Sequence, residues 1–174
     1  MMLLTTDRLN IRPVELDDWK RLKEIWIDFT ASKYAQYDTP HATDDEKAFA
    51  RVSRWAACTG TDHIFFAVCL DSTVIGYIAF NQRENSHEIG YCFHSAYHGK
   101  GYAKESLRKL FKHLRTLGIT KFTVGTAINN TPSVALLKSL GFFLTGCEKV
   151  SFYKDANGSD IVFDGGIFEF ENKE

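Results

Sequence analysis

Two glycines that join a strand to a helix are the strongest chemical signal in this sequence. Residues 88–93 alternate as in a buried strand, Gly99 and Gly101 follow in a tight turn, and from Leu107 apolar residues recur at helical spacing. Backbone N–H groups at the start of such a helix lack partners within it and lie at the positive end of its dipole. We therefore expect the loop 98–104 to bind an anion, such as the phosphates of a nucleotide.

The spacing of these glycines excludes two common phosphate-binding loops. A dinucleotide-binding loop needs a third small residue five positions after the first glycine, and that position is Lys104. The P-loop pattern, in which Gly-Lys-Ser/Thr follows a first glycine after four residues, does not occur here. The pattern that remains is Gly-x-Gly-x-Ala, residues 99–103, behind an aromatic strand.

Four segments resemble the GNAT N-acetyltransferases, in particular their RimJ/RimL-type branch. His98–Ala103 is similar to the pyrophosphate loop of the family, and Thr5–Pro13 is similar to its opening strand. Asn129–Ser133, followed by Leu140–Phe142, is similar to its Asn-x-x-Ser and Leu-Gly-Phe segment, and the chain closes with two strand-like runs as the family does. The resemblance covers essentially the whole chain. It implies a single α+β domain over residues 1–174, with the GNAT fold: a central mixed, mostly antiparallel sheet flanked by helices.

The resemblance also implies acetyl-CoA as co-substrate and residues that hold it. The loop amides would bind the pyrophosphate with Lys100 and Lys104 beside them, although a solvated helix start explains these two lysines equally well. The main chain of Cys92 and Phe93 would pair with the pantetheine arm, and the N–H of one of them would face the thioester carbonyl. Asn130 would contact the end of that arm, and it also suits a helix cap. The implied binding residues are Cys92, Phe93, His98, Gly99, Lys100, Gly101, Tyr102, Ala103, Lys104 and Asn130.

The implied reaction is direct attack of an amine on the thioester, so no covalent nucleophile is required. Glu88, where the family often has an acidic residue, is our candidate base acting through a water; a surface strand glutamate is the competing interpretation. Many superfamily members protonate the leaving thiolate with a tyrosine, but that position is Leu137 here. Ser133 or a bound water is the candidate replacement, and Tyr153 and Tyr97 are weaker candidates. A non-catalytic acyl-CoA-binding module is therefore the alternative to an enzyme.

The acceptor stays open between a peptide N-terminus and a small-molecule amine. A formal charge of −1 and a pI near 6.6 argue against a nucleic-acid partner, and no apolar run approaches the length of a membrane span. The four cysteines form no C-x-x-C pair, so we expect free thiols and a cytoplasmic protein. We expect a monomer or a homodimer. Three histidines near the loop, His87, His94 and His98, lack a second cluster of ligands, so no metal is expected.

The elements that would position these residues follow from periodicity and turn signals. We expect a first strand over Leu3–Arg12 that stops before Pro13, and then a helix capped by Asp17 or Asp18. Capping-box spacing at Thr43–Glu46 opens a second helix, which Gly60 would close. The remaining expected elements are strands over 64–70, 74–80 and 87–93, a helix ending at Gly118, a strand over 121–128, a helix from Pro132 to Gly141, and a hairpin over 142–153 and 161–170 around Asn157-Gly158.

Overall fold

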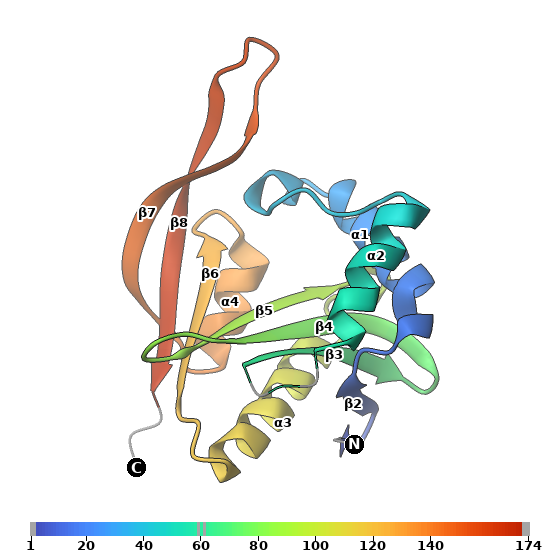
Figure 1. Ribbon diagram of the computed structural model, residues 1–174. Helices are drawn as coiled ribbons and strands as arrows, with labels where there is room; N and C mark the ends of the chain where they lie inside the picture. Colours follow the sequence, from blue (N-terminus) through green and yellow to red (C-terminus); the bar gives the residue numbers. More distant parts are fainter. Residues whose placement is uncertain (1–2, 59, 61, 172–174) are drawn as a thin grey trace.

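Eight strands form one sheet in the computed structural model, which describes residues 3–58, 60 and 62–171 (Figure 1). The strands lie in the order β1-β2-β3-β4-β5-β6-β8-β7, and all neighbours are antiparallel except β5 and β6. Their bounds are β1 Leu4–Thr5, β2 Leu9–Pro13, β3 His63–Leu70, β4 Thr73–Gln82, β5 His87–Phe93, β6 Lys121–Ala127, β7 Phe143–Lys154 and β8 Asp160–Glu171. The predicted α+β architecture with a mixed, mostly antiparallel sheet is confirmed.

Helices cover both faces of this sheet and bury two apolar clusters. On one face lie α1 (Trp19–Thr30) and α2 (Asp45–Ala56), where Trp26 and Val52 are fully buried against β3 and β4. On the other face α3 (Tyr102–Thr116) and α4 (Thr131–Ser139) bury a stripe that includes Leu107, Leu110 and Leu137. The short 3-10 helices are η1 Leu16–Asp18, η2 Ala35–Tyr37 and η3 Ser95–Tyr97.

The parallel pairing of β5 and β6 is short, and this opens the sheet. Only two residue pairs join the strands, His87 with Phe122 and Glu88 with Thr123. Beyond Glu88 the two strands diverge, while β6 stays paired with β8 along its whole length. The hairpin of β7 and β8 then rises beyond the body of the molecule on one side of this opening (Figure 1).

The N-terminal strand differs from its prediction. The sequence suggested one strand over Leu3–Arg12, but the chain forms two short antiparallel strands, and Pro13 is the last residue of the second. The reversal lies at Thr6, whose hydroxyl accepts a hydrogen bond from the Leu9 N–H at 2.9 Å. This side-chain bond stabilises a turn that apolar periodicity does not register.

The helix ends predicted for the first 60 residues were also partly wrong. Asp18 does not cap α1; its buried carboxylate accepts hydrogen bonds from Arg12 and from the Glu15 N–H. Asp44 rather than Thr43 caps α2, by accepting from the Lys47 N–H at 2.9 Å. α2 ends at Ala56, four residues before Gly60. For Asp18 the packed chain supplies a partner, Arg12, that local pattern does not indicate.

Candidate active site

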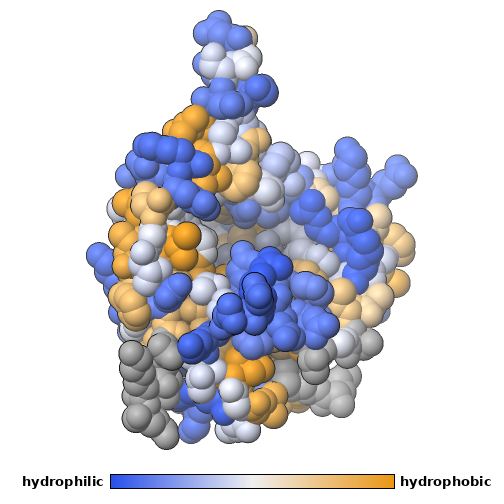
Figure 2. All heavy atoms as spheres, turned by 60° about the vertical axis from the view of Figure 1, so that its left-hand side comes forward, coloured by the Kyte–Doolittle hydropathy of each residue, from blue (hydrophilic) through white to orange (hydrophobic). Residues whose placement is uncertain are grey.

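A cleft of about 840 Å³ lies where β5 and β6 diverge. One wall is β5 with the loop 98–104, and the opposite wall is β6 with the start of α4. The far end is bounded by the segment around η2 and by the inner face of the β7–β8 hairpin. In the space-filling view of Figure 2 the surface is hollowed below the hairpin. Eleven of the twelve predicted site residues line this cleft, and Lys100 is not among them.

The glycine loop has the backbone conformation that the sequence predicted. Gly99 and Gly101 have φ values of +72° and +81°, a region that residues with a Cβ rarely adopt. Gly101 immediately precedes α3, so the first N–H groups of the helix are presented at the end of the cleft. Lys100 turns away, because its ammonium donates to the Ala96 carbonyl at 3.0 Å and lies over the Tyr97 ring.

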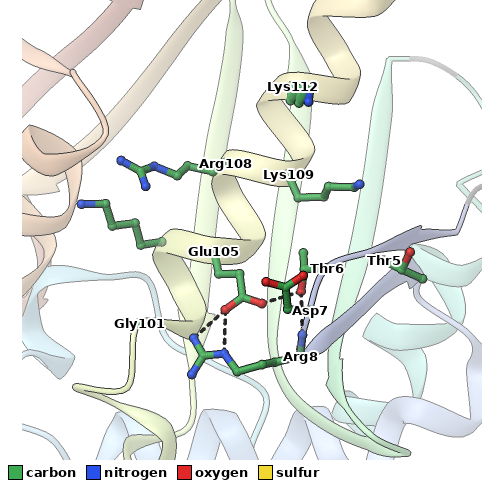
Figure 3. A pocket seen from close by; sticks show the side chains of 10 residues that line it. Thr5, Thr6, Asp7, Arg8, Gly101, Glu105, Arg108, Lys109 and Lys112 are labelled. Atoms are coloured by element: carbon green, nitrogen blue, oxygen red, sulfur yellow. Dashed lines mark hydrogen bonds and ion pairs between the residues drawn. The ribbon is translucent and has the colours of Figure 1, made fainter.

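Arg8 stabilises this loop from outside the cleft. Its guanidinium pairs with Glu105 on α3, donates to the Lys100 carbonyl at 3.1 Å and lies over the Tyr102 ring. Figure 3 shows Arg8 and Thr6 converging on Glu105 in a second pocket, of about 700 Å³. Burial alone would raise the pKa of Glu105, but the hydrogen bonds from Thr6 and Arg8 bring it below its ordinary value. The predicted opening segment therefore stabilises the loop from a distance of more than 90 residues in sequence.

The main chain of Phe93 faces the opening between the strands. The His94 N–H donates to the Ile75 carbonyl of the β4 segment, and facing residues of an antiparallel pair alternate between bonded and non-bonded. The Cys92 main chain is thus used by the ladder with β4, and that of Phe93 points toward β6. Consistent with this, the Phe93 carbonyl accepts from His98 Nε2 at 2.7 Å. Of the two predicted main-chain contacts, this geometry favours Phe93.

Gly76 allows the Phe93 side chain to lie against β4. A Cβ at Gly76 would stand 2.3 Å from the Phe93 ring, far inside van der Waals contact. The position of β5 beside the cleft therefore depends on Gly76, which the sequence alone did not indicate as a site residue.

Ser133 is hydrogen-bonded to a residue that the sequence reading missed. Its Oγ lies 2.8 Å from the hydroxyl of Tyr91, which projects from β5 toward α4. Burial raises the pKa of Tyr91 to about 12, against the opposing effect of the hydrogen bond with Ser133. Asn130 caps α4 by accepting, at 3.4 Å, from the Ser133 N–H, so its predicted capping role is confirmed. Leu137 is fully buried in the core.

Glu88 lies at the base of the cleft and carries an ion pair. Arg83 donates two hydrogen bonds to its Oε2 atom, one of them 2.8 Å long from Nε, and Oε1 receives neither. Among the described residues, no group of three or more His, Cys, Asp or Glu side chains is arranged to hold a metal ion. Likewise, none of the helices in the described part of the chain is long and apolar enough to cross a membrane.

Comparison with known proteins identifies the family. The model of the acetyltransferase (GNAT) domain matches residues 8–143. The chain belongs to the GNAT acetyltransferase family. It is an acetyl-CoA-dependent N-acetyltransferase, which transfers an acetyl group from acetyl-CoA to an amine.

Curated and solved relatives of this GNAT enzyme agree with that assignment. The uncharacterized N-acetyltransferase YnaD of Bacillus subtilis is 29% identical over 153 residues, which are 85% of this chain and 86% of YnaD. An acetyltransferase of Salmonella typhimurium that modifies the N-terminal serine of ribosomal protein L7/L12 has a TM-score of 0.85 at 19% identity, over 99% of this chain and 100% of that one. RimL in complex with coenzyme A has a TM-score of 0.83 at 19% identity, over 98% of each chain. At these identities the two structures show a shared fold.

Most of this GNAT site could be found from local signals, and Tyr91 could not. The glycine pattern and the Asn-x-x-Ser segment are contiguous in sequence, and the structure brings both to one cleft. Tyr91 lies 42 positions before Ser133, and an aromatic residue in a buried strand reads as packing.

Proposed function

We propose that this GNAT enzyme acetylates a primary amine by direct attack on acetyl-CoA bound between β5 and β6. The observation that carries the proposal is the divergence of these strands directly beside a glycine loop that begins a helix. The loop amides would hold the pyrophosphate, with Lys104 at the rim of the cleft. The pantetheine arm would lie along β5, where the alternation of the ladder leaves the Phe93 main chain available.

The Phe93 N–H is our candidate for stabilising the oxyanion that forms on the thioester carbonyl. A backbone donor held in a strand is pre-organised, and such donors contribute strongly in a site that excludes water. When the tetrahedral intermediate collapses, the thiolate of CoA needs a proton. Ser133 would supply it, with Tyr91 hydrogen-bonded behind.

Glu88 is our candidate for relaying the proton of the amine. Because both Arg83 bonds go to Oε2, Oε1 has room to accept from a water that reaches the acceptor. Leu137 takes no part in proton transfer, because it is an apolar side chain packed in the core.

For the acceptor we propose the amino terminus of a peptide, ahead of a small-molecule amine. Support comes from the wide end of the cleft beneath the β7–β8 hairpin and from the fold shared with RimL, which is named for acetylating the α-amino group of a ribosomal protein. The four cysteines are free, which suits a reducing cytoplasm.

Thiol release tests the proposal. The wild-type protein is mixed with acetyl-CoA and a panel of tripeptides and small primary amines, and free CoA is followed with a thiol reagent. Acetyl-CoA binding is measured separately by calorimetry. Turnover that depends on the amine supports the proposal, and tripeptides should be the better substrates. Tight binding of acetyl-CoA with no turnover on any amine would instead favour a non-catalytic acyl-CoA-binding module.

A further inference from the structure

Four carboxylates line the cleft, and Arg83 and Ser95 bind two of them. Glu88 pairs with Arg83. Asp28 accepts from the backbone N–H and the hydroxyl of Ser95 at 2.7 and 2.6 Å, and these bonds lower its pKa although burial acts to raise it. The remaining two are Glu148 and Asp38, whose Oδ1 accepts from the N–H of the adjacent Thr39 at 2.7 Å while Oδ2 faces His41.

Asp38 lies at the acceptor end of the cleft, directly after η2. Its side chain is 48% exposed, and within residues 3–58, 60 and 62–171 neither a lysine nor an arginine forms an ion pair with it. Burial, together with the smaller effects of the negative charges of Asp38 and Asp28, raises the pKa of the Cys92 thiol to about 12. Because Cys92 adjoins Phe93 on β5, the charge of Asp38 is felt close to the strand that would contact the thioester.

The side chain of His41 is buried next to Asp38. His41 is only 7% exposed, stacks parallel on Trp26 with ring centroids 6.1 Å apart, and has the edge of Phe29 against it. Its Nε2 lies 3.3 Å from Asp38 Oδ2, yet in the described part of the chain this buried atom makes no properly directed hydrogen bond. Buried polar atoms are rarely left in this state unless they serve a site.

Arg51 determines which nitrogen of His41 carries the proton. Its Nη1 approaches Nδ1 at 3.5 Å, and a guanidinium can only donate. This contact favours the tautomer in which Nδ1 accepts and the neutral ring carries its proton on Nε2, facing Asp38. In this tautomer Nε2 can donate to Asp38 after a small reorientation and cannot take a proton from it, so we assign His41 a positioning role.

Aromatic side chains surround the same end of the cleft. Tyr37 of η2 contacts Phe163 of β8 edge to face at 5.1 Å, and Phe152 of β7 packs on Phe163 at 5.7 Å. With Tyr34 these rings form an apolar wall that lines the cleft near Asp38. A ligand for this end should combine a cation with an apolar body.

We propose that Asp38, held against His41, binds the ammonium group of the acceptor, and that the acceptors are primary ammonium compounds with an apolar or aromatic group next to the amine. This assignment rests on the proposed function, because it places the ammonium near the acetyl group that β5 would present. Peptides with an apolar first side chain and aromatic alkylamines both belong to this class.

The experiment compares a cationic and a neutral nucleophile of the same shape. Benzylamine is an ammonium ion at pH 7, whereas O-benzylhydroxylamine carries the same ring and a neutral amino group. Asp38→Asn should raise KM for benzylamine about 10- to 100-fold, and should leave KM for O-benzylhydroxylamine and the Kd of acetyl-CoA within about twofold. Asp38→Glu should restore part of the affinity for benzylamine. Glu148→Gln removes the other carboxylate of the cleft that forms no ion pair with a lysine or arginine of the described residues, so it is the matched control and should change neither KM.

His41 is tested as a positioning residue. His41→Phe keeps a ring beside Trp26 but removes Nε2, so KM for benzylamine should rise while kcat is retained, and the effect should vanish when Asp38→Asn is already present. Circular dichroism verifies that each variant is folded.

Three results would overturn the assignment: equal losses for both probes in Asp38→Asn, no loss for benzylamine, or wild-type protein that binds acetyl-CoA but does not acetylate benzylamine. Failure of the wild-type protein to bind acetyl-CoA is a separate result, and it would refute the proposed function together with this assignment.

Discussion

The contact between Tyr91 and Ser133 makes the sharpest prediction about catalysis. Since the pKa of Tyr91 is raised to about 12, its hydroxyl keeps its proton at neutral pH. It can then donate to Ser133 Oγ at 2.8 Å, which would leave the serine proton available for the thiolate of a bound CoA. Tyr91→Phe removes this donor while preserving the ring that packs against the core.

The two residues should differ in the size of their effect. Removing one neutral hydrogen bond costs about 0.5–1.5 kcal/mol, so Tyr91→Phe should lower kcat by about two- to tenfold. Ser133→Ala removes the proton donor itself and should lower kcat by about 10²–10⁴. If Tyr91 acts only through Ser133, adding Tyr91→Phe to Ser133→Ala should cause no further loss.

Steady-state thiol release on the best amine of the panel gives kcat for the four proteins of this cycle. Calorimetry with acetyl-CoA verifies that binding is unchanged, and Tyr97→Phe serves as a control because Tyr97 also lines the cleft. Wild-type kcat in Tyr91→Phe, or losses that multiply fully in the double variant, would refute the relay.

Three further predictions test the loop, the buried thiol and the base. Ala103→Glu should weaken acetyl-CoA binding at least about 100-fold by calorimetry, because it places a negative charge where we propose that the pyrophosphate binds. Lys109→Glu on the outer side of α3 should not weaken it, and equal losses would remove the loop from the site. Cys92→Ala should retain activity. Burial raises the pKa of this thiol from 9.0 to about 12, so the thiol loses its proton at lower pH in the unfolded chain than in the folded one. The free energy of unfolding should therefore fall by about 1.4 kcal/mol per pH unit between pH 9 and 12. Chemical denaturation should show that this contribution is absent in Cys92→Ala. Glu88→Gln should lower kcat by about 10²–10⁴ with a deficit that shrinks as pH rises; an unchanged pH profile would return Glu88 to a structural role in its pair with Arg83.

Local pattern was sufficient for much of this molecule. The positions of Gly99 and Gly101 predicted the left-handed backbone and the start of α3, because the backbone conformation of a glycine turn depends on few neighbours. Apart from the division of the first strand into β1 and β2, the order of the longer strands and helices followed from apolar periodicity and turn signals, since each element must bury one face. Eleven of the twelve site residues that the family resemblance implied line one cleft of the structure.

Long-range packing decided the rest. Lys100 reads as a phosphate ligand in sequence, but the Ala96 carbonyl and the Tyr97 ring hold its ammonium away from the cleft. Tyr91 and Ser133 meet because α4 packs on the face of the sheet to which the Tyr91 side chain points. Residues that share no local periodicity carry no signal of their contact in a single sequence. For the same reason the sequence did not predict the contact between Asp38 and His41. It forms only in the folded chain, where Trp26 and Phe29 of α1 pack against the imidazole.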